Sequence, residues 1–282
     1  MTNLFTKIKP DKDIQVQKLR VGKVPVLILR PRHKQENVAA PALLWIHGGG
    51  YFLGMKEMVY MGRAADLVKK FGITVVSPGY RLAFFKPYPA ALLDCYRTLL
   101  FMKKEAAALG IDADRIMVGG ESAGGGLAAA LCMLAHDKGK VKIAWHFPLY
   151  PMLSNLDTGS SRDNHGRVWN TKRNHLGWKL YLRENAAKTV SPYASPIQRK
   201  DFSGLPPAYT FVGDGEPFYE ETLAYVRKLN EAGVEASCDV YHTDMHAFDL
   251  LEPDAEVSQT AIRKFEEQVE YALTHMAAGC AG

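Results

Sequence analysis

The sequence predicts an α/β protein built on a mostly parallel sheet of about eight strands, with helices on both faces. Short apolar stretches alternate with helical stretches along most of the chain, which is the pattern of successive β–α units. A strand, a tight turn that carries Ser122 and a packed helix follow one another at residues 114–134. Three glycines follow a second buried strand at residues 48–50. Because such sheets bind ligands beyond the carboxyl ends of their strands, both features are expected at one edge.

The first two predicted strands form a hairpin. Residues 14–21 alternate partly between apolar and polar side chains, as an edge strand does, and residues 24–29 follow after a turn at Gly22. Residues 42–46 are continuously apolar, which is typical of a central strand buried on both faces. The later strands are predicted at residues 73–77, 114–118, 141–147, 208–213 and 237–241.

Helices are predicted between these strands, and glycines mark their ends. A helix over residues 58–71 stops at Gly72, and one over residues 89–109 stops at Gly110. The last helix, residues 253–276, repeats an apolar side chain every four residues. Two further helices are predicted at residues 126–134 and 222–232.

The β–α rhythm breaks at about residues 152–205. This stretch is polar and basic, but it contains interspersed aromatic residues, which argue against a disordered loop. Residues 169–183 could form a helix. We therefore predict a single domain over residues 1–282, with a cap inserted at about 152–205 over the carboxyl edge of the sheet.

Composition is ordinary for a globular chain of 282 residues, with 47% hydrophobic and 23% charged residues. The net charge of +5 is not gathered in a dense basic run, so no nucleic-acid partner is expected. Cys95, Cys132 and Cys238 lie in apolar stretches and are expected to be buried reduced thiols, and Cys280 lies near the end of the chain.

No metal site and no cofactor are predicted, because the four cysteines lack the spacing of metal ligands and no phosphate-binding glycine loop is evident. Residues 1–10 lack the apolar core of a signal peptide, and no stretch approaches the ~20 apolar residues of a membrane span. The expected location is therefore cytoplasmic, with no membrane partner.

Ser122 lies in the pattern Gly120-Glu121-Ser122-Ala123-Gly124, between a strand and a helix. A serine in so sharp a turn needs small neighbours two residues away on either side, and the two glycines meet that need. The turn places the hydroxyl at a helix N-terminus, where free amides favour a developing negative charge. This context is that of a nucleophile elbow.

The stretch His47-Gly48-Gly49-Gly50 follows the central strand directly. Consecutive glycines let a backbone pass close to another group and adopt conformations that are closed to other residues. We expect the amides of Gly49 and Gly50 to point at a carbonyl oxygen, as in an oxyanion loop. His47 is expected to brace this loop rather than act as a base.

A serine hydroxyl is a weak nucleophile, so it needs a base and an acid that orients the base. In folds where a nucleophile elbow carries the serine, the acid and then the histidine follow the serine along the chain. His246, in the loop after the last predicted strand, is the candidate base, and His242 is the alternative.

These motifs together resemble the hormone-sensitive-lipase-like family of α/β-hydrolase esterases. The matching stretches occur in family order over about residues 40–250. They are His47-Gly48-Gly49-Gly50, Tyr80-Arg81-Leu82-Ala83, Pro89-Ala90-Ala91, Gly120-Glu121-Ser122-Ala123-Gly124-Gly125, Ser191-Pro192-Tyr193, Leu205-Pro206-Pro207-Ala208 and His246-Ala247-Phe248.

The resemblance implies the α/β-hydrolase fold and a role for each matching site residue. Ser122 would be the nucleophile and His246 the general base. The amides of Gly49, Gly50 and Ala123 would form the oxyanion hole.

The acid of the triad is implied by a second stretch. The family motif Asp-Pro-Leu-x-Asp-Glu matches Glu216-Pro217-Phe218-Tyr219-Glu220-Glu221, which makes Glu216 the favoured acid. Asp214, on the same loop, is the competing candidate. Glu220 and Glu221 are expected to be acids of a helix N-terminus that suit its dipole.

Two departures from the family pattern affect the expected site. Phe84 and Phe85 stand where the family often has Pro-Glu, and these rings would either line the pocket or pack under the cap. The segment before the first strand is short, which predicts a more open site, or one completed by a partner chain in a homo-oligomer.

The predicted function is a serine carboxylesterase that hydrolyses small-molecule esters with short acyl chains, acetyl among them. Trp169, Trp178 and Tyr193 could stack on a sugar alcohol or serve only for packing. Two alternatives stay open at this stage: a hydrolase-fold protein that binds a small ligand without turnover, and a serine hydrolase that acts on amides or thioesters.

Overall fold

The structure is a computed structural model, and it describes residues 11–33, 39–187 and 189–278. Eight strands form one sheet in the order β1-β2-β4-β3-β5-β6-β7-β8. β2 pairs antiparallel with both β1 and β4, and the remaining neighbours pair parallel. The strands are β1 (Ile14–Val21), β2 (Val24–Pro31), β3 (Ala40–Ile46), β4 (Thr74–Pro78), β5 (Ile111–Glu121), β6 (Trp145–Leu149), β7 (Ala208–Gly213) and β8 (Ala236–Tyr241).

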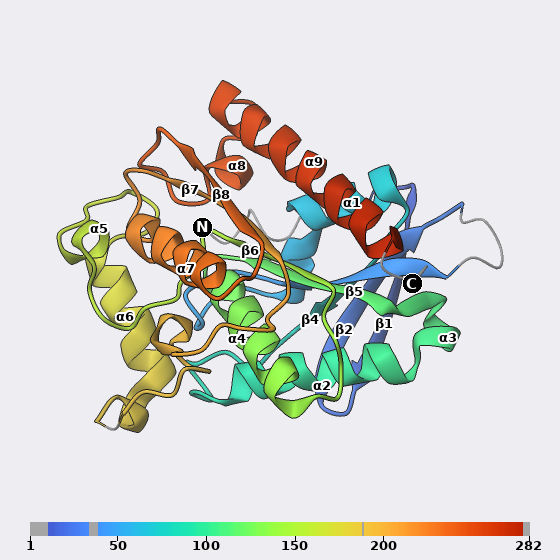
Figure 1. Ribbon diagram of the computed structural model, residues 1–282, viewed down its shortest axis with the longest axis horizontal. Helices are drawn as coiled ribbons and strands as arrows, with labels where there is room; N and C mark the ends of the chain where they lie inside the picture. Colours follow the sequence, from blue (N-terminus) through green and yellow to red (C-terminus); the bar gives the residue numbers. More distant parts are fainter. Residues whose placement is uncertain (1–10, 34–38, 188, 279–282) are drawn as a thin grey trace.

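Helices cover both faces of this sheet, with α1, α8 and α9 on one face and α2, α4 and α7 on the other (Figure 1). The described α-helices are α1 (Arg63–Phe71), α2 (Ala90–Lys104), α3 (Ala106–Leu109), α4 (Ala123–Lys138), α5 (Gly159–Arg162), α6 (Thr171–Leu182), α7 (Tyr219–Glu231), α8 (Phe248–Leu251) and α9 (Glu256–Ala278). The 3-10 helices among the described residues are η2 (Lys56–Tyr60), η3 (Arg183–Ala187) and η4 (Pro196–Gln198).

The central strands are apolar on both sides because each face has its own helix layer. Successive side chains of a strand point to opposite faces. In β3, Leu43 and Trp45 therefore belong to the core under α1 and α9, whereas Leu44 and Ile46 belong to the core under α2 and α4. Burying one such side chain fully stabilises the fold by about 1.5–3 kcal/mol.

α4 differs from the other helices because it is buried on almost every side. A helix that is apolar all round belongs in a protein interior. Its first turn is Ala123-Gly124-Gly125-Gly126, and these small residues let it approach the sheet and residues 149–152 closely. The N-terminus of α4 consequently points at the end of β5, where Ser122 lies.

Several predicted boundaries need correction. The helix expected over 58–71 is a 3-10 turn followed by α1, because the extended Gly62 separates them. The strand expected from residue 141 starts at Trp145, although the Ala144 amide already donates to the Ile116 carbonyl at 2.8 Å. The helix expected over 89–109 divides into α2 and α3 at Glu105.

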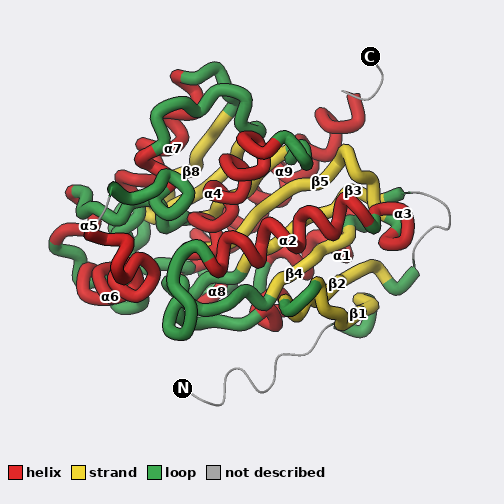
Figure 2. The backbone as a smooth tube through the Cα atoms, turned by 90° about the horizontal axis from the view of Figure 1, so that it is seen from below, coloured by secondary structure: helices red, strands yellow, loops and turns green. Residues whose placement is uncertain are grey.

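Residues 152–205, where the β–α rhythm of the sequence breaks, contain α5, α6, η3 and η4. Their described part contains no strand. Figures 1 and 2 both place α5 and α6 at the end of the molecule opposite α3. The expected helix in this stretch is α6, which begins at Thr171.

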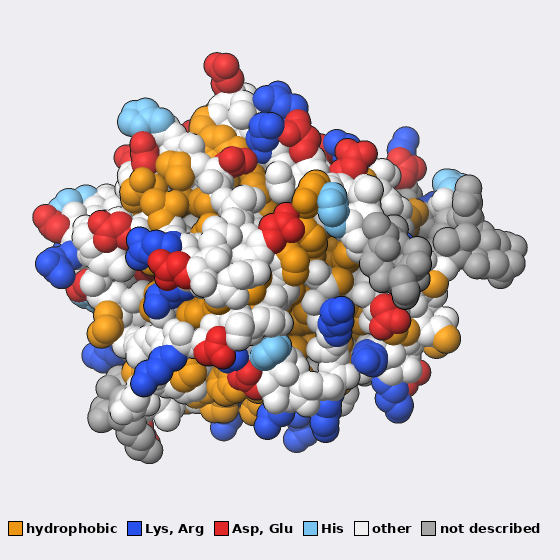
Figure 3. Space-filling view, in the orientation of Figure 1, with side chains coloured by type: hydrophobic (Ala, Val, Ile, Leu, Met, Phe, Trp, Pro, Cys, Tyr) orange, Lys and Arg blue, Asp and Glu red, His pale blue; other side chains and the backbone are white. Residues whose placement is uncertain are grey.

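Charges of both signs lie on the surface (Figure 3), and three of the four cysteines are among the described residues. On the face drawn in Figure 3, basic and acidic side chains are interspersed. Cys95 and Cys132 are buried free thiols, whereas Cys238 is only partly buried. Cys280 and the segment 1–10, on which two expectations rest, lie outside the described residues. No described helix is long and apolar enough to cross a membrane.

Candidate active site

Ser122 stands between β5 and α4 in a backbone conformation that non-glycine residues rarely adopt, with φ 57° and ψ −120°. Such strain persists only where the surroundings enforce it. A Cβ at Gly120 would lie 2.4 Å from the Ile46 carbonyl oxygen, and one at Gly124 would lie 2.0 Å from the same atom. The turn can therefore pack against the end of β3 only because both positions are glycine.

The glycine loop runs past Ser122 from the end of β3. A Cβ at Gly48 would lie 3.3 Å from the Ser122 Cβ. Gly49 and Gly50 have φ of 112° and 59°, and the Gly49 carbonyl accepts the Leu53 amide at 2.9 Å, which closes a turn. Within the described chain, the amides of Gly49, Gly50 and Ala123 donate to no other protein group. They are therefore available to a ligand beside Ser122.

His246 links Ser122 to a buried carboxylate. Its Nε2 lies 2.8 Å from Ser122 Oγ, and its Nδ1 is hydrogen-bonded to Glu216 Oε2. The other oxygen, Oε1, accepts the Gly213 amide at 2.9 Å. His246 and Glu216 are 4% and 0% exposed. The structure thus brings together all three side chains that the resemblance named.

The competing candidates pair with each other instead. His242 Nδ1 lies 2.8 Å from Asp214 Oδ2, and the His242 side chain is fully exposed. The hydrogen bond to Asp214 raises the pKa of His242, and the same bond lowers the pKa of Asp214. This surface pair stands apart from the hydrogen bonds that join Ser122, His246 and Glu216.

His47 lies under the glycine loop and is fully buried. Its Nδ1 lies 2.8 Å from the Gly48 carbonyl oxygen, and its ring stacks on Tyr80 with centroids 4.2 Å apart. The Tyr80 hydroxyl donates to the His47 carbonyl at 3.0 Å. Burial lowers the pKa of His47 to about 4, so the ring is neutral at pH 7 and its Nδ1–H donates to Gly48. These contacts brace the glycine loop against Tyr80.

Aromatic rings surround His246 and the glycine loop. Tyr150 and Phe218 meet the His246 ring nearly perpendicularly, each with a centroid distance of 5.1 Å. A Cβ at Gly50 would lie 2.2 Å from a ring carbon of Trp169, so the indole rests directly on that glycine. Sequence reasoning missed Tyr150, although a tyrosine immediately after a predicted parallel strand is a signal for the carboxyl edge.

The other aromatic residues considered from the sequence lie elsewhere. Trp178 packs against Tyr51 with ring centroids 5.4 Å apart, and the Tyr193 hydroxyl donates to Asp137. Phe84 and Phe85 are 60% and 73% exposed, so the expectation that they could pack under residues 152–205 is wrong. They pack on each other, in a T-shaped arrangement with centroids 5.3 Å apart.

Glu220 and Glu221, in the first turn of α7, do more than interact with the helix dipole. Glu221 is 1% exposed and accepts the amides of Leu153 and Ser154, the latter at 3.2 Å. Burial raises the pKa of Glu221 to about 8. Glu220 accepts the Gly159 amide at 2.7 Å. Both acids therefore fasten residues 153–159 to α7.

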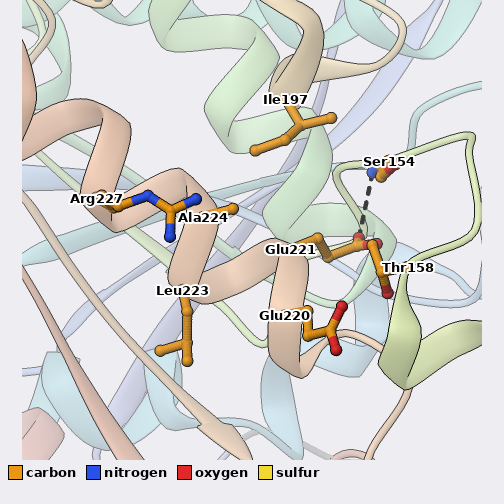
Figure 4. Close-up of a pocket in the computed structure, with 8 residues that line it drawn as sticks. All are labelled: Ser154, Thr158, Ile197, Glu220, Glu221, Leu223, Ala224 and Arg227. Carbon is orange, nitrogen blue, oxygen red and sulfur yellow. Dashed lines mark hydrogen bonds between the residues drawn. The ribbon is translucent and has the colours of Figure 1, made fainter.

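A cavity of about 360 Å³ lies beside these two acids. Figure 4 shows the residues that line it. The buried carboxyl of Glu221 and the rim side chain of Arg227 lie along one wall, and Ile197 of η4 closes the opposite side. This cavity is separate from the groups that surround Ser122. Its lining residues are Ser154, Thr158, Ile197, Glu220, Glu221, Leu223, Ala224 and Arg227.

Among the described residues, no group of three or more His, Cys, Asp or Glu side chains could hold a metal ion. Near Ser122 the structure assembles a hydroxyl, an imidazole, a carboxylate and three free N–H donors.

An eight-stranded, mostly parallel sheet with a strained serine between strand and helix defines an α/β hydrolase. Residues 43–250 match the family described as having the alpha/beta hydrolase fold. The chain belongs to this family, that of the hormone-sensitive-lipase-like esterases.

Relatives with known names support this assignment. An arylesterase of Saccharolobus solfataricus is 31% identical over 84% of this chain and 76% of its own length. An ethyl acetate hydrolase of Pseudomonas putida is 30% identical over 80% of this chain and 71% of its own length. A hydrolase of Acanthamoeba polyphaga mimivirus is matched over only 66% of its length.

Solved structures agree with the fold. A bacterial heroin esterase superposes with a TM-score of 0.84 at 32% identity, covering 95% of this chain and 85% of that one. An esterase of the archaeon Pyrobaculum calidifontis gives a TM-score of 0.82 at 30% identity, covering 96% and 87%. The predictions of family, fold and enzyme class, a carboxylic ester hydrolase, are confirmed.

Proposed function

We propose that the chain is a serine carboxylesterase acting on small esters with short acyl groups. Ser122 is the nucleophile, His246 the general base and Glu216 the acid. The observation that carries the proposal is the buried hydrogen-bonded series from Ser122 Oγ through His246 to Glu216, beside three free amides. The esterase names of the relatives agree with this reaction.

The reaction begins when Ser122 Oγ attacks the ester carbonyl carbon and its proton passes to His246 Nε2. Glu216 stabilises the imidazolium that forms and, by accepting Nδ1–H, keeps Nε2 free to act as the base. The oxyanion of the tetrahedral intermediate accepts hydrogen bonds from the Gly49, Gly50 and Ala123 amides. Each such donor is worth about 10²–10³ in turnover.

When the intermediate collapses, the carbon–alkoxide bond breaks and His246 returns its proton to the departing alcohol. A water molecule then attacks the acyl-Ser122 ester, with His246 again taking a proton. Collapse of this second intermediate releases the carboxylic acid and restores Ser122. No cofactor enters either half of the cycle.

Residues 152–205 form the cap of this site in our proposal. Two contacts support that assignment. Trp169 rests on Gly50, and a Cβ at Gly177 of α6 would lie 3.1 Å from the Gly50 carbonyl oxygen. Because the indole occupies the space above an oxyanion donor, little room is left there, which favours short acyl groups such as acetyl.

The test compares Ser122→Ala with Ser77→Ala, a control at another buried serine, whose Oγ donates to the Lys56 carbonyl at 3.1 Å. With p-nitrophenyl acetate, we expect kcat/KM to fall by about 10⁴-fold or more in Ser122→Ala and to stay within about two-fold in the control. Matched acetyl ester, amide and thioester substrates should rank the ester first. Unchanged turnover in a folded Ser122→Ala protein would reject the proposal.

A further inference from the structure

Tyr150 occupies an unusual position beside His246. It follows β6 directly, is 0% exposed and has a positive φ of 33°. Its amide donates to the Phe211 carbonyl at 3.0 Å, which fixes the backbone to β7. Its ring meets the His246 imidazole at 79°, with centroids 5.1 Å apart. The ring is therefore held rigidly against one side of the imidazole.

The hydroxyl of the same tyrosine reaches the segment that follows His246. It donates to Asp249 Oδ1 at 2.9 Å. Asp249 is 0% exposed and lies in α8, which begins at Phe248, two residues after His246. Ala247, between them, has a positive φ of 58°. One side chain thus contacts both the imidazole and the helix to which the histidine loop is attached.

Asp249 has few other polar partners. Its Oδ2 lacks a hydrogen-bond partner in the described part of the chain, and Arg63 Nε lies 3.7 Å away as an ion pair. Burial raises the pKa of Asp249 to about 6, while Arg63 opposes that shift. The buried carboxylate is therefore held by Arg63 on one oxygen and by Tyr150 on the other.

The buried polar groups around Asp249 extend to Glu121, the last residue of β5. Glu121, the residue before Ser122, accepts the Trp45 Nε1–H at 2.8 Å. Burial, and next the charge of Asp249, raise the pKa of Glu121 to about 8. Both carboxyls are buried and adjoin site residues in the chain: Glu121 immediately precedes Ser122, and Asp249 lies three residues after His246.

We propose that Tyr150 and Asp249 are positioning residues for the reaction: their hydrogen bond fixes the loop that carries His246, and the tyrosine ring fixes the imidazole plane. The inference rests on the proposed function. It assigns to these two residues the orientation that keeps Nε2 on Ser122 and Nδ1 on Glu216. Both residues would act through His246 and its loop rather than on the substrate.

The size of the effect follows from geometry. A displacement of about 1 Å in a reacting group can cost about 10²-fold in rate. Tyr150→Phe keeps the ring but leaves Asp249 Oδ1 without its donor, so α8 and His246 are free to shift. We expect kcat to fall about 10- to 100-fold, with KM within about three-fold, because substrate contacts are unchanged.

The chain offers a matched control. Tyr209 is 1% exposed and also donates to an aspartate, with its hydroxyl 2.8 Å from Asp239 Oδ2, but it joins β7 to β8 within the sheet. Tyr209→Phe should keep kcat within about two-fold. Rates with p-nitrophenyl acetate are divided by the active-site concentration, which is titrated with an organophosphonate, so that inactive protein does not imitate a catalytic defect.

The conservative variant Asp249→Asn retains an acceptor for the Tyr150 hydroxyl, and kcat should stay within about five-fold of wild type. Asp249→Ala removes the acceptor and should match Tyr150→Phe. Should Tyr150→Phe fail to fold, the Asp249 pair decides the question. A wild-type kcat per titrated site in Tyr150→Phe or Asp249→Ala, with only a lower melting temperature, would overturn the inference. An active Ser122→Ala would instead overturn the proposed function itself.

Discussion

Replacing Glu216 by glutamine tests the assignment of the acid, because each carboxylate oxygen of Glu216 accepts a hydrogen bond in the structure. Oε1 accepts the Gly213 amide at 2.9 Å, and Oε2 accepts the Nδ1–H of His246. A glutamine has only one acceptor end. Whichever way the amide is turned, its NH₂ group faces either the Gly213 N–H or the His246 Nδ1–H.

The expected loss follows from the tautomer of His246. If the NH₂ group faces Nδ1, the proton moves to Nε2 and the ring can no longer accept the Ser122 proton. A comparable change of a triad carboxylate to an amide lowers kcat about 10⁴-fold. If the amide turns the other way, its NH₂ group faces the Gly213 N–H, and the two buried donors push the loop that carries residue 216 away. We therefore expect a loss of about 10³–10⁴ in kcat, or ~4–5 kcal/mol in the barrier.

Asp214→Asn is the comparison variant, because Asp214 is the competing acid and its side chain is 39% exposed beside the fully exposed His242. Its kcat should stay within about two-fold of wild type, since surface ion pairs contribute little. Initial rates with p-nitrophenyl acetate at pH 8, with circular dichroism as a check of folding, suffice. Equal losses in both variants, or a loss below ten-fold in Glu216→Gln, would refute this reasoning.

Three further perturbations test other parts of the account. Gly124→Ala should lower the free energy of unfolding, measured in urea, by about 3 kcal/mol or more, because the new Cβ would stand 2.0 Å from the Ile46 carbonyl oxygen. The control Gly139→Ala, with open space around the new Cβ, should lower it by about 1 kcal/mol. Since the folded-state pKa of Glu221 is about 8, above its usual 4.5, its stabilising contribution is complete below pH 4.5 and is lost as pH rises towards 8. Melting temperatures at pH 5 and pH 9 should therefore differ less in Glu221→Gln than in wild type, and an equal difference would contradict this linkage. Trp169→Ala should raise kcat/KM for p-nitrophenyl octanoate relative to the acetate by about ten-fold, and an unchanged ratio would remove Trp169 as the limit on acyl length.

Much of the fold could be predicted because its signals are local. The continuous apolar residues of β3 and β4 need only a sheet with helices on both faces, and glycines mark where α1 and α3 end. α8 was not predicted, since four residues carry no periodicity. Its place depends on the buried Asp249, whose partners Tyr150 and Arg63 are distant in sequence.

The candidate site divides in the same way. Ser122 and the glycine loop could be predicted from local steric needs, and His246 from chain order. Glu216 could be favoured over Asp214 only through the family motif, because two carboxylates on one loop look alike in sequence. Their burial and hydrogen-bond partners, which differ in the structure, depend on residues distant in the chain. The exposure of Phe84 and Phe85 could not be predicted either, since their backbone is held by a residue distant in sequence: Arg183 donates to the Ala83 and Phe84 carbonyls at 3.1 and 2.6 Å.

The most direct test of the central claim is the intact mass of the protein after treatment with a serine-directed organophosphonate. A serine becomes reactive only when its base and oxyanion donors are assembled around it. The account predicts one adduct per wild-type chain and none on Ser122→Ala. An unmodified but folded wild-type protein, or an adduct that persists in Ser122→Ala, would contradict it.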